Sequence, residues 1–144
     1  MCNSSDFYFW KPLGMPEIQQ KMLSCKGWQA KYVYLISLAK QLPEMPLELQ
    51  VDSNKITGCE VDTWLAYKIV DDRIYFCAHS KAKITKGIIA LILIHIQGNS
   101  IDALKKVDFG DLLHAYSLFN NLSASRVNGL SAFVEKIKYI CLKY

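Results

Sequence analysis

The sequence predicts an α+β fold in which a small antiparallel sheet packs against helices. Apolar residues recur at helical spacing in the first third of the chain, two strand-like segments follow, and further helical segments make up the rest. The length of 144 residues fits one core, so residues 1–144 are expected to form a single domain. With 51% hydrophobic and 21% charged residues, the composition is typical of a packed globule.

Two helices are predicted before the sheet. Residues 1–15 are expected to be irregular, and they include an aromatic cluster at residues 7–10 that either packs onto the body or contacts a partner. A helix is predicted to open at Pro16, because proline suits the first helical turn, and to break at Gly27. A second helix is predicted from residue 28 to about residue 42, where prolines follow and stop it.

The predicted sheet is a single hairpin. Residues 63–70 are rich in bulky and β-branched side chains, Asp71-Asp72 is typical of a turn, and residues 73–78 form the second strand. The segment before the hairpin, up to Lys55, is expected to be a polar loop. Cys59 then lies just before the first strand, at one end of the sheet.

Helices are predicted again after the hairpin. The apolar run after Lys83 is long enough to favour a helix over a strand, and Gly87 near its start is expected to allow a close approach between helix and sheet. Short helices are predicted over residues 101–107, capped by Ser100, and over residues 108–115. The last helix is predicted from 123 to 142, with one apolar face made of Leu130, Phe133, Val134, Ile137 and Cys141.

Charge and hydropathy argue against two classes of partner. The net charge of +4 is mild and the lysines are scattered, so we expect no nucleic-acid partner. The most apolar segment, residues 88–96, has about half the length of a membrane-spanning helix, so we expect no membrane partner either. Residues 1–6 have no basic region and no apolar stretch, unlike a secretory signal. The simplest location is therefore cytoplasmic.

Five cysteines are spread along the chain, at positions 2, 25, 59, 77 and 141. None forms a Cys-x-x-Cys pair, so the pattern indicates neither a metal cage nor a disulfide framework. In a reducing compartment a lone thiol stays free to react. Cys59 follows a glycine in a loop, so its single sulfur atom is a candidate for a reactive thiol. The alternative is a buried, inert thiol.

Three segments together resemble one family. The first is Ile56-Thr57-Gly58-Cys59 followed by Trp64, the second is His79-Ser80 leading into Ile84-Thr85-Lys86-Gly87-Ile88, and the third is Leu122-Ser123-Ala124-Ser125-Arg126-Val127-Asn128-Gly129-Leu130. Their order and spacing are similar to those of the SufE family and its close relative CsdE, the sulfur-acceptor proteins of iron–sulfur cluster assembly. The resemblance covers roughly residues 16–143.

The resemblance implies a fold and a function. The fold would be SufE-like, similar to that of iron–sulfur scaffold proteins. The chain would be a sulfur carrier with no cofactor of its own, rather than an independent enzyme. Its partners would be a pyridoxal-phosphate-dependent cysteine desulfurase of the SufS or CsdA type, which it stimulates, and an iron–sulfur scaffold complex. Cys59 would take the sulfur as a persulfide.

Four further residues are expected to support Cys59. Gly58 allows backbone angles closed to other residues, and Trp64 is expected to pack under the loop as a core anchor. Arg126 either positions the loop or docks the desulfurase, with a local capping or salt-bridge role equally open. His79 stands where the family often has an acidic residue, and Thr63 where it often has valine; Val61 likewise replaces a frequent serine.

A small Cys-His enzyme is one alternative. Cys59 and His79 flank the hairpin at what we expect to be the same end, so they could form a nucleophile–base dyad of a hydrolase or transferase. His95 falls in an apolar run and is expected to be a core histidine, whereas His114 has no evident partner.

An iron–sulfur scaffold is the other alternative. It would need three or four thiolates or histidines that converge on one point. Cys59 and His79 could supply two, and Cys77 would share one side of a strand with His79. Cys25 and Cys141 are expected on helical core faces, which leaves such a cage incomplete.

Overall fold

The computed structural model describes residues 15–144 and confirms the α+β fold. The aromatic cluster at residues 7–10 and the segment expected to be irregular lie outside the described residues, apart from Met15, which begins the first helix. The helices are α1 (Met15–Ser24), α2 (Gly27–Ala39), α3 (Lys83–Ile96), α4 (Ile101–Lys105), α5 (Phe109–Ala115) and α6 (Ala124–Cys141), and the strands are β1 (Thr63–Val70) and β2 (Arg73–Ser80).

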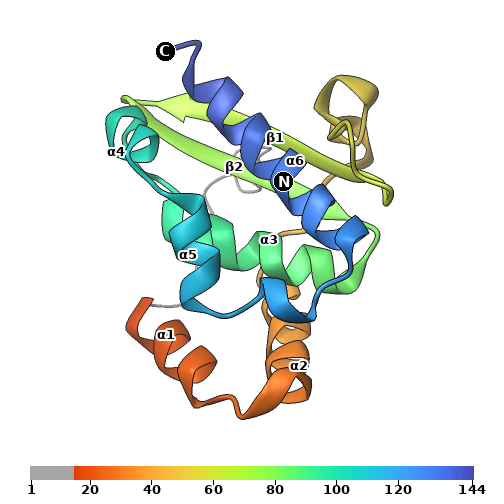
Figure 1. The fold of residues 1–144 in the computed structure, drawn as a ribbon. Coiled ribbons are helices and arrows are strands. Elements are labelled where there is room, and N and C mark those ends of the chain that lie inside the picture. The colour runs from red at the N-terminus through yellow and green to blue at the C-terminus, as the bar shows by residue number, and fades with distance from the viewer. Residues whose placement is uncertain (1–14) are drawn as a thin grey trace.

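Helix α3 is the central element. It contacts α2 on one side and the hairpin and α6 on the other, so that the hairpin, α3 and α2 follow one another through the molecule (Figure 1). Residues 89–93 of α3 are completely buried. A helix enclosed in this way has no face for polar residues, which explains the unbroken apolar run. Across residues 15–144, no helix combines the length and the apolarity needed to cross a membrane.

Gly87 allows α2 and α3 to approach closely. A Cβ atom at this position would overlap the carbonyl oxygen of Leu35 and lie 2.7 Å from its carbonyl carbon. The close approach is therefore between two helices, and the predicted approach between helix and sheet is wrong. The sequence shows that a small residue is present but not which neighbour requires it.

The hairpin is longer than predicted. Its register pairs Val70 with Arg73 at the turn and Thr63 with Ser80 at the open end, two residues beyond the predicted end of the second strand. Asp71 and Asp72 both have positive φ, 53° and 64°, as the two central residues of a type I′ turn require. Aspartate tolerates this conformation better than most residues, which explains why the turn lies at this dipeptide.

The two faces of the hairpin have different covers. Leu65 lies on the face toward α3 and α6, whereas Trp64 is buried on the other face in a separate cluster with Met45, Ala66 and Cys77. Leu49 packs against this second cluster. The segment expected to be a polar loop thus covers a sheet face, through two 3₁₀ turns at Leu47–Leu49 and Asp52–Asn54.

The helix ends follow local chemistry. Helix α2 stops at Ala39, three residues before the predicted end, because Pro43 disfavours helical backbone in the residue before it and residues 40–42 form a turn. The side chains of Ser100, Asp108 and Ser123 accept hydrogen bonds at the amino ends of α4, α5 and α6. The predicted apolar face of α6 is buried throughout.

Gly87→Ala should destabilise the fold by about 3 kcal/mol, because the added methyl group must push apart two packed backbones. Gly110→Ala is the matched control, since Gly110 is exposed on α5 and its added methyl meets only the Asp108 side chain. That control should change stability by less than about 1 kcal/mol. Urea unfolding measures both, and equal midpoints for the two variants would contradict the close packing of α2 on α3.

Candidate functional site

Cys59 lies in a loop that is closed at its base. The amide of Ile56 donates to the carbonyl of Thr63 at 2.8 Å, and Lys55 forms a bridge with Trp64. The amide of Lys81 donates to the carbonyl of Asp62 at 3.0 Å. These backbone bonds join the two ends of the loop to each other and to the residue after β2. These bonds therefore hold the base of the loop and leave its tip to other contacts.

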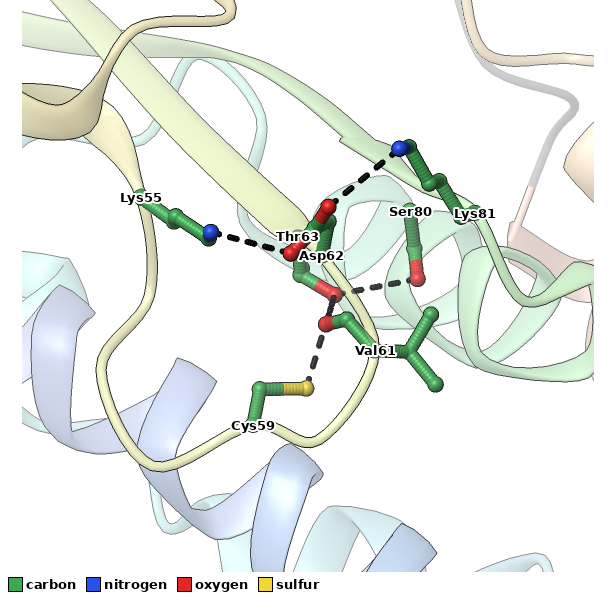
Figure 2. A network of polar contacts seen from close by, with 7 residues as sticks. All are labelled: Lys55, Cys59, Val61, Asp62, Thr63, Ser80 and Lys81. Carbon is green, nitrogen blue, oxygen red and sulfur yellow. Dashed lines mark hydrogen bonds and ion pairs between the residues drawn. The ribbon is translucent and has the colours of Figure 1, made fainter.

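Asp62 adds an ion-pair clamp at the same base. Its carboxylate oxygens lie 2.9 Å from Lys55 Nζ and 3.2 Å from Lys81 Nζ, as Figure 2 shows. Hydrogen bonds from Lys55 and Lys81 lower the pKa of Asp62, and the same contact raises the pKa of Lys55. The clamp is therefore ionised at neutral pH and loosens only when the pH falls through the lowered pKa of Asp62.

Glycine shapes the tip of the loop on both sides of the thiol. Gly58 has φ +92°, a conformation that other residues rarely adopt, and an added Cβ would meet only Ala132 at 3.7 Å. Gly129 of α6 lies on the other side, where an added Cβ would come within 2.8 Å of Cys59 Sγ. The half-buried sulfur thus rests directly on the α6 backbone. The Cys59 side chain turns into the loop toward Thr63 (Figure 2).

Thr63 provides the polar contact of the thiol. Its Oγ1 lies 3.4 Å from Cys59 Sγ and 3.0 Å from each of two other partners, the Val61 carbonyl and the Ser80 hydroxyl. The Thr63 hydroxyl has one proton, and it can donate that proton in a hydrogen bond to either of these closer oxygens. The oxygen of Thr63 then offers a lone pair to the sulfur, so the neutral thiol donates this weak hydrogen bond. Oxidation or alkylation of the sulfur would abolish it.

His79 and Trp64 lie on the opposite face of the hairpin from Cys59. They are a cross-strand pair with stacked rings, 5.9 Å between centroids and 15° between planes, next to the Thr63–Ser80 pair that faces the thiol. Neighbouring strand residues point to opposite faces, so the dyad of Cys59 with His79 is not assembled. Burial and the nearby lysines lower the pKa of His79. Trp64 is buried as expected, but its cover is the segment at residues 43–54.

Of the remaining described cysteines, two are less exposed than Cys59 and one, Cys25, is half-buried like it. Cys77 and Cys141 are buried, and burial raises the pKa of Cys77 to about 11. Cys25 is half-buried just after the end of α1, where its thiol donates to the Lys21 carbonyl at 3.1 Å, so its predicted place on a helical core face is wrong. Within residues 15–144, no three groups of metal-ligand type lie close enough to hold one ion.

Arg126 connects two helices close to the loop. Its Nη1 donates to Thr85 Oγ1 at 3.2 Å, and Thr85 is a buried residue in the first turn of α3. Its backbone amide donates to the Ser123 cap. Gly129 is one helical turn further along α6, on the same side as Arg126. The guanidinium thus contacts a hydroxyl rather than a carboxylate, and this bond ties α6, which carries Gly129, to α3.

The other two histidines lie away from the thiol. Nδ1 of His95 donates to the Leu91 carbonyl at 2.9 Å, and its Nε2 lies 3.1 Å from the hydroxyl of Tyr116. Burial lowers the pKa of His95, in keeping with a neutral ring whose second nitrogen accepts from Tyr116. His95 is therefore a satisfied core histidine, as expected. His114 is exposed on α5 and lies edge-on to Phe119.

Sequence reasoning missed the clamp and the resting place of the thiol. Lys55, Asp62 and Lys81 are seven and more residues apart, and only the hairpin brings the second lysine to the carboxylate. Gly129 belongs to one of the three motifs described above, but nothing in the sequence alone indicates that its missing side chain faces Cys59. In contrast, the glycine before Cys59 is a usable signal for the positive φ at the tip.

The chain around this loop matches a known family model. Residues 16–141 match the model described as "SufE: Fe-S metabolism associated domain". The chain belongs to the SufE family. All the residues that surround Cys59 lie within the matched range, from Lys55 in the loop base to Gly129 on α6.

Similarity to individual proteins supports the same family assignment. The chain is 36% identical over 111 residues to the sulfur acceptor protein CsdE of Escherichia coli (strain K12), covering 76% of each protein. It is 36% identical over 117 residues to the cysteine desulfuration protein SufE of Wigglesworthia glossinidia brevipalpis, covering 80% of this chain and 81% of that one. A solved structure of a hypothetical protein from Thermus thermophilus shares the fold, with TM-score 0.72, 17% identity, and coverage of 92% of this chain and 96% of that one.

Asp62→Asn should loosen the base of the loop without unfolding the protein, because the clamp is exposed and screened. The amides of Ile56 and Lys81 should exchange with deuterium about two- to fivefold faster, the size typical of exposed ion pairs. High salt should speed exchange at the same two amides in the unsubstituted protein and have no further effect in the variant. Asp111→Asn on α5 is the control, and equal exchange in both variants would refute the clamp.

Proposed function

We propose that this SufE-family protein accepts sulfur from a cysteine desulfurase on Cys59 and passes it on for iron–sulfur cluster assembly. The supporting observation is the position of one half-buried thiol at the tip of a closed loop, in a chain that matches the SufE domain over residues 16–141. The relatives named sulfur acceptor and cysteine desulfuration proteins support the same activity. Gly58 supports the transfer in this proposal because it gives the tip its shape.

The proposed step is a transfer of one sulfur atom between two cysteines. The Cys59 thiolate attacks the terminal sulfur of a persulfide on the desulfurase. A sulfur–sulfur bond forms at Cys59, the bond inside the donor persulfide breaks, and the donor cysteine leaves as a thiolate. The thiol proton of Cys59 goes to solvent or to a base on the partner. No electrons enter or leave, so the step needs no oxidant, and the pyridoxal phosphate that generates the persulfide belongs to the desulfurase.

The resting position of the thiol suits a carrier. A fully exposed thiolate would be open to oxidation, and a fully buried one, such as Cys77, could not reach a partner. Cys59 lies between these limits, because its side chain packs against Gly129 of α6 and beside Thr63. Because the backbone bonds hold only the base of the loop, a partner can displace the tip from Gly129 and Thr63 without breaking the hairpin. Taking over the sulfur frees the desulfurase for another turnover, which is how the protein would stimulate it.

The supporting residues act by position in this proposal. Arg126 holds the first turn of α6 to Thr85 of α3 and so fixes the helix on which Cys59 rests. Trp64 and His79 hold the opposite face of the hairpin at its open end, directly behind the Thr63–Ser80 pair. The desulfurase would meet the loop from the tip, and a scaffold complex would take the sulfur from the same exposed side.

Cys59→Ser should abolish stimulation, leaving a cysteine desulfurase at its basal rate, because serine cannot form a persulfide. Stimulation is measured as the rate of sulfide or alanine release from free cysteine with increasing amounts of the protein. Cys25→Ser is the matched control, since it removes another half-buried thiol, and Cys77→Ser removes a buried one. Both controls should stimulate normally. Stimulation by Cys59→Ser equal to that of the unsubstituted protein would overturn the proposed function.

A further inference from the structure

We infer that Gly129 and Thr63 are positioning residues that together form the seat of the resting Cys59 thiol and set how often that thiol is presented to a partner. The inference rests on the proposed function for its biological meaning, but the seat itself is defined by geometry alone. Gly129 comes from α6 and Thr63 from the first position of β1, so the seat joins two elements that are far apart in the sequence.

Gly129 is the steric half of the seat. It is a buried glycine in the interior of a long helix, where alanine would be the more favourable residue. The helix has no need of glycine there for its backbone angles, because positive φ occurs among the described glycines only at Gly27, Gly58 and Gly98. The need comes from outside the helix, since a Cβ would lie 2.8 Å from Cys59 Sγ and 3.9 Å from Cys59 Cβ. The first distance is a collision and the second an ordinary contact.

Thr63 is the polar half of the seat. Its side chain is almost completely buried and its hydroxyl is held by the Val61 carbonyl and the Ser80 hydroxyl, so the oxygen that faces the sulfur is fixed in place. The 3.4 Å contact with Cys59 Sγ is long but within the range of a sulfur hydrogen bond. Valine has the same shape without the oxygen, and serine keeps the oxygen without the methyl group.

These two contacts set an equilibrium between two positions of the thiol. In the seated position it rests on Gly129 and Thr63, and in the presented position it has left both and is open to a partner. Only the presented thiol can attack a partner's persulfide, so the apparent affinity for the partner is reduced by the fraction of molecules in which the thiol is presented. Weakening the seat should therefore lower the concentration that half-saturates a desulfurase, while the maximal rate of the saturated complex stays the same. A residue with a purely structural role would not produce this split.

The direct test is the rate at which iodoacetamide alkylates Cys59, followed by peptide mass spectrometry so that the other cysteines do not interfere. Gly129→Ala should raise that rate about tenfold or more, because the added methyl excludes the seated sulfur. Gly110→Ala, at an exposed glycine of α5, should leave that rate unchanged. An alkylation rate in Gly129→Ala equal to that of the unsubstituted protein would overturn the inference.

The Thr63 half is tested by two substitutions of opposite kind. Thr63→Val should raise the alkylation rate about two- to tenfold, the value of one hydrogen bond in an equilibrium. Thr63→Ser keeps the hydroxyl and should react at close to the original rate. The reverse order, a faster reaction in Thr63→Ser than in Thr63→Val, would show that packing of the methyl group holds the loop and would refute the polar half of the seat.

A double-substitution cycle separates the seat from general damage to α6. In a Cys59→Ala background the sulfur is absent, so Gly129→Ala should raise the melting temperature, as expected when alanine replaces glycine in a helix. With Cys59 present, the same substitution should raise it less or lower it. An equal shift in both backgrounds would mean that Gly129 and Cys59 do not interact.

The desulfurase titration keeps the two claims apart. If Gly129→Ala presents Cys59 faster to iodoacetamide and half-saturates the desulfurase at a lower concentration, both claims stand. If alkylation is faster in Gly129→Ala but neither the variant nor the unsubstituted protein stimulates any desulfurase, the seat stands and the proposed function fails. If stimulation is normal but alkylation is unchanged, the proposed function stands and the seat fails.

Discussion

The pairing of Thr63 with Ser80 at the open end of the hairpin is the contact on which the rest of the site depends. It turns the Thr63 hydroxyl toward Cys59 and, by strand alternation, sends Trp64 and His79 to the opposite face. A slip of one residue would exchange these sets of side chains. Because the strand pairing extends to Ser80, this register is held up to the base of the loop, where the Ile56–Thr63 bond and the Asp62 clamp close it.

The helices position the other side of the site, where Gly129 meets Cys59. Arg126 ties α6 to α3, and α3 is held in turn by α2 through the close approach at Gly87. These contacts therefore fix the position of Gly129 relative to Cys59 at the loop tip. Two glycines along this series of contacts, Gly87 and Gly129, bring backbones and a sulfur atom together where any side chain would keep them apart. The thiol is consequently neither free in solvent nor lost in the core.

Much of the fold follows from local sequence, and the exceptions have physical causes. The turn at Asp71-Asp72, the Ser100 cap of α4 and the apolar face of α6 are short-range signals, and the structure has all of them at the predicted places. The cover at residues 43–54 is predicted as a polar loop because Pro43 and Pro46 interrupt it, and only the outer face of the hairpin explains the packing of Met45 and Leu49. Cys59 can be selected from its loop and motif, whereas its contacts with Thr63 and Gly129 depend on tertiary structure that no local pattern encodes.

The central claim is that Cys59 carries the sulfur. Intact-protein mass spectrometry after incubation with a cysteine desulfurase, pyridoxal phosphate and free cysteine tests it most directly. The account predicts a mass increase of one sulfur atom that a reductant reverses and that peptide mapping assigns to Cys59. A sulfur adduct mapped to Cys25 or another cysteine, or no adduct on a protein whose Cys59 reacts readily with iodoacetamide, would contradict it.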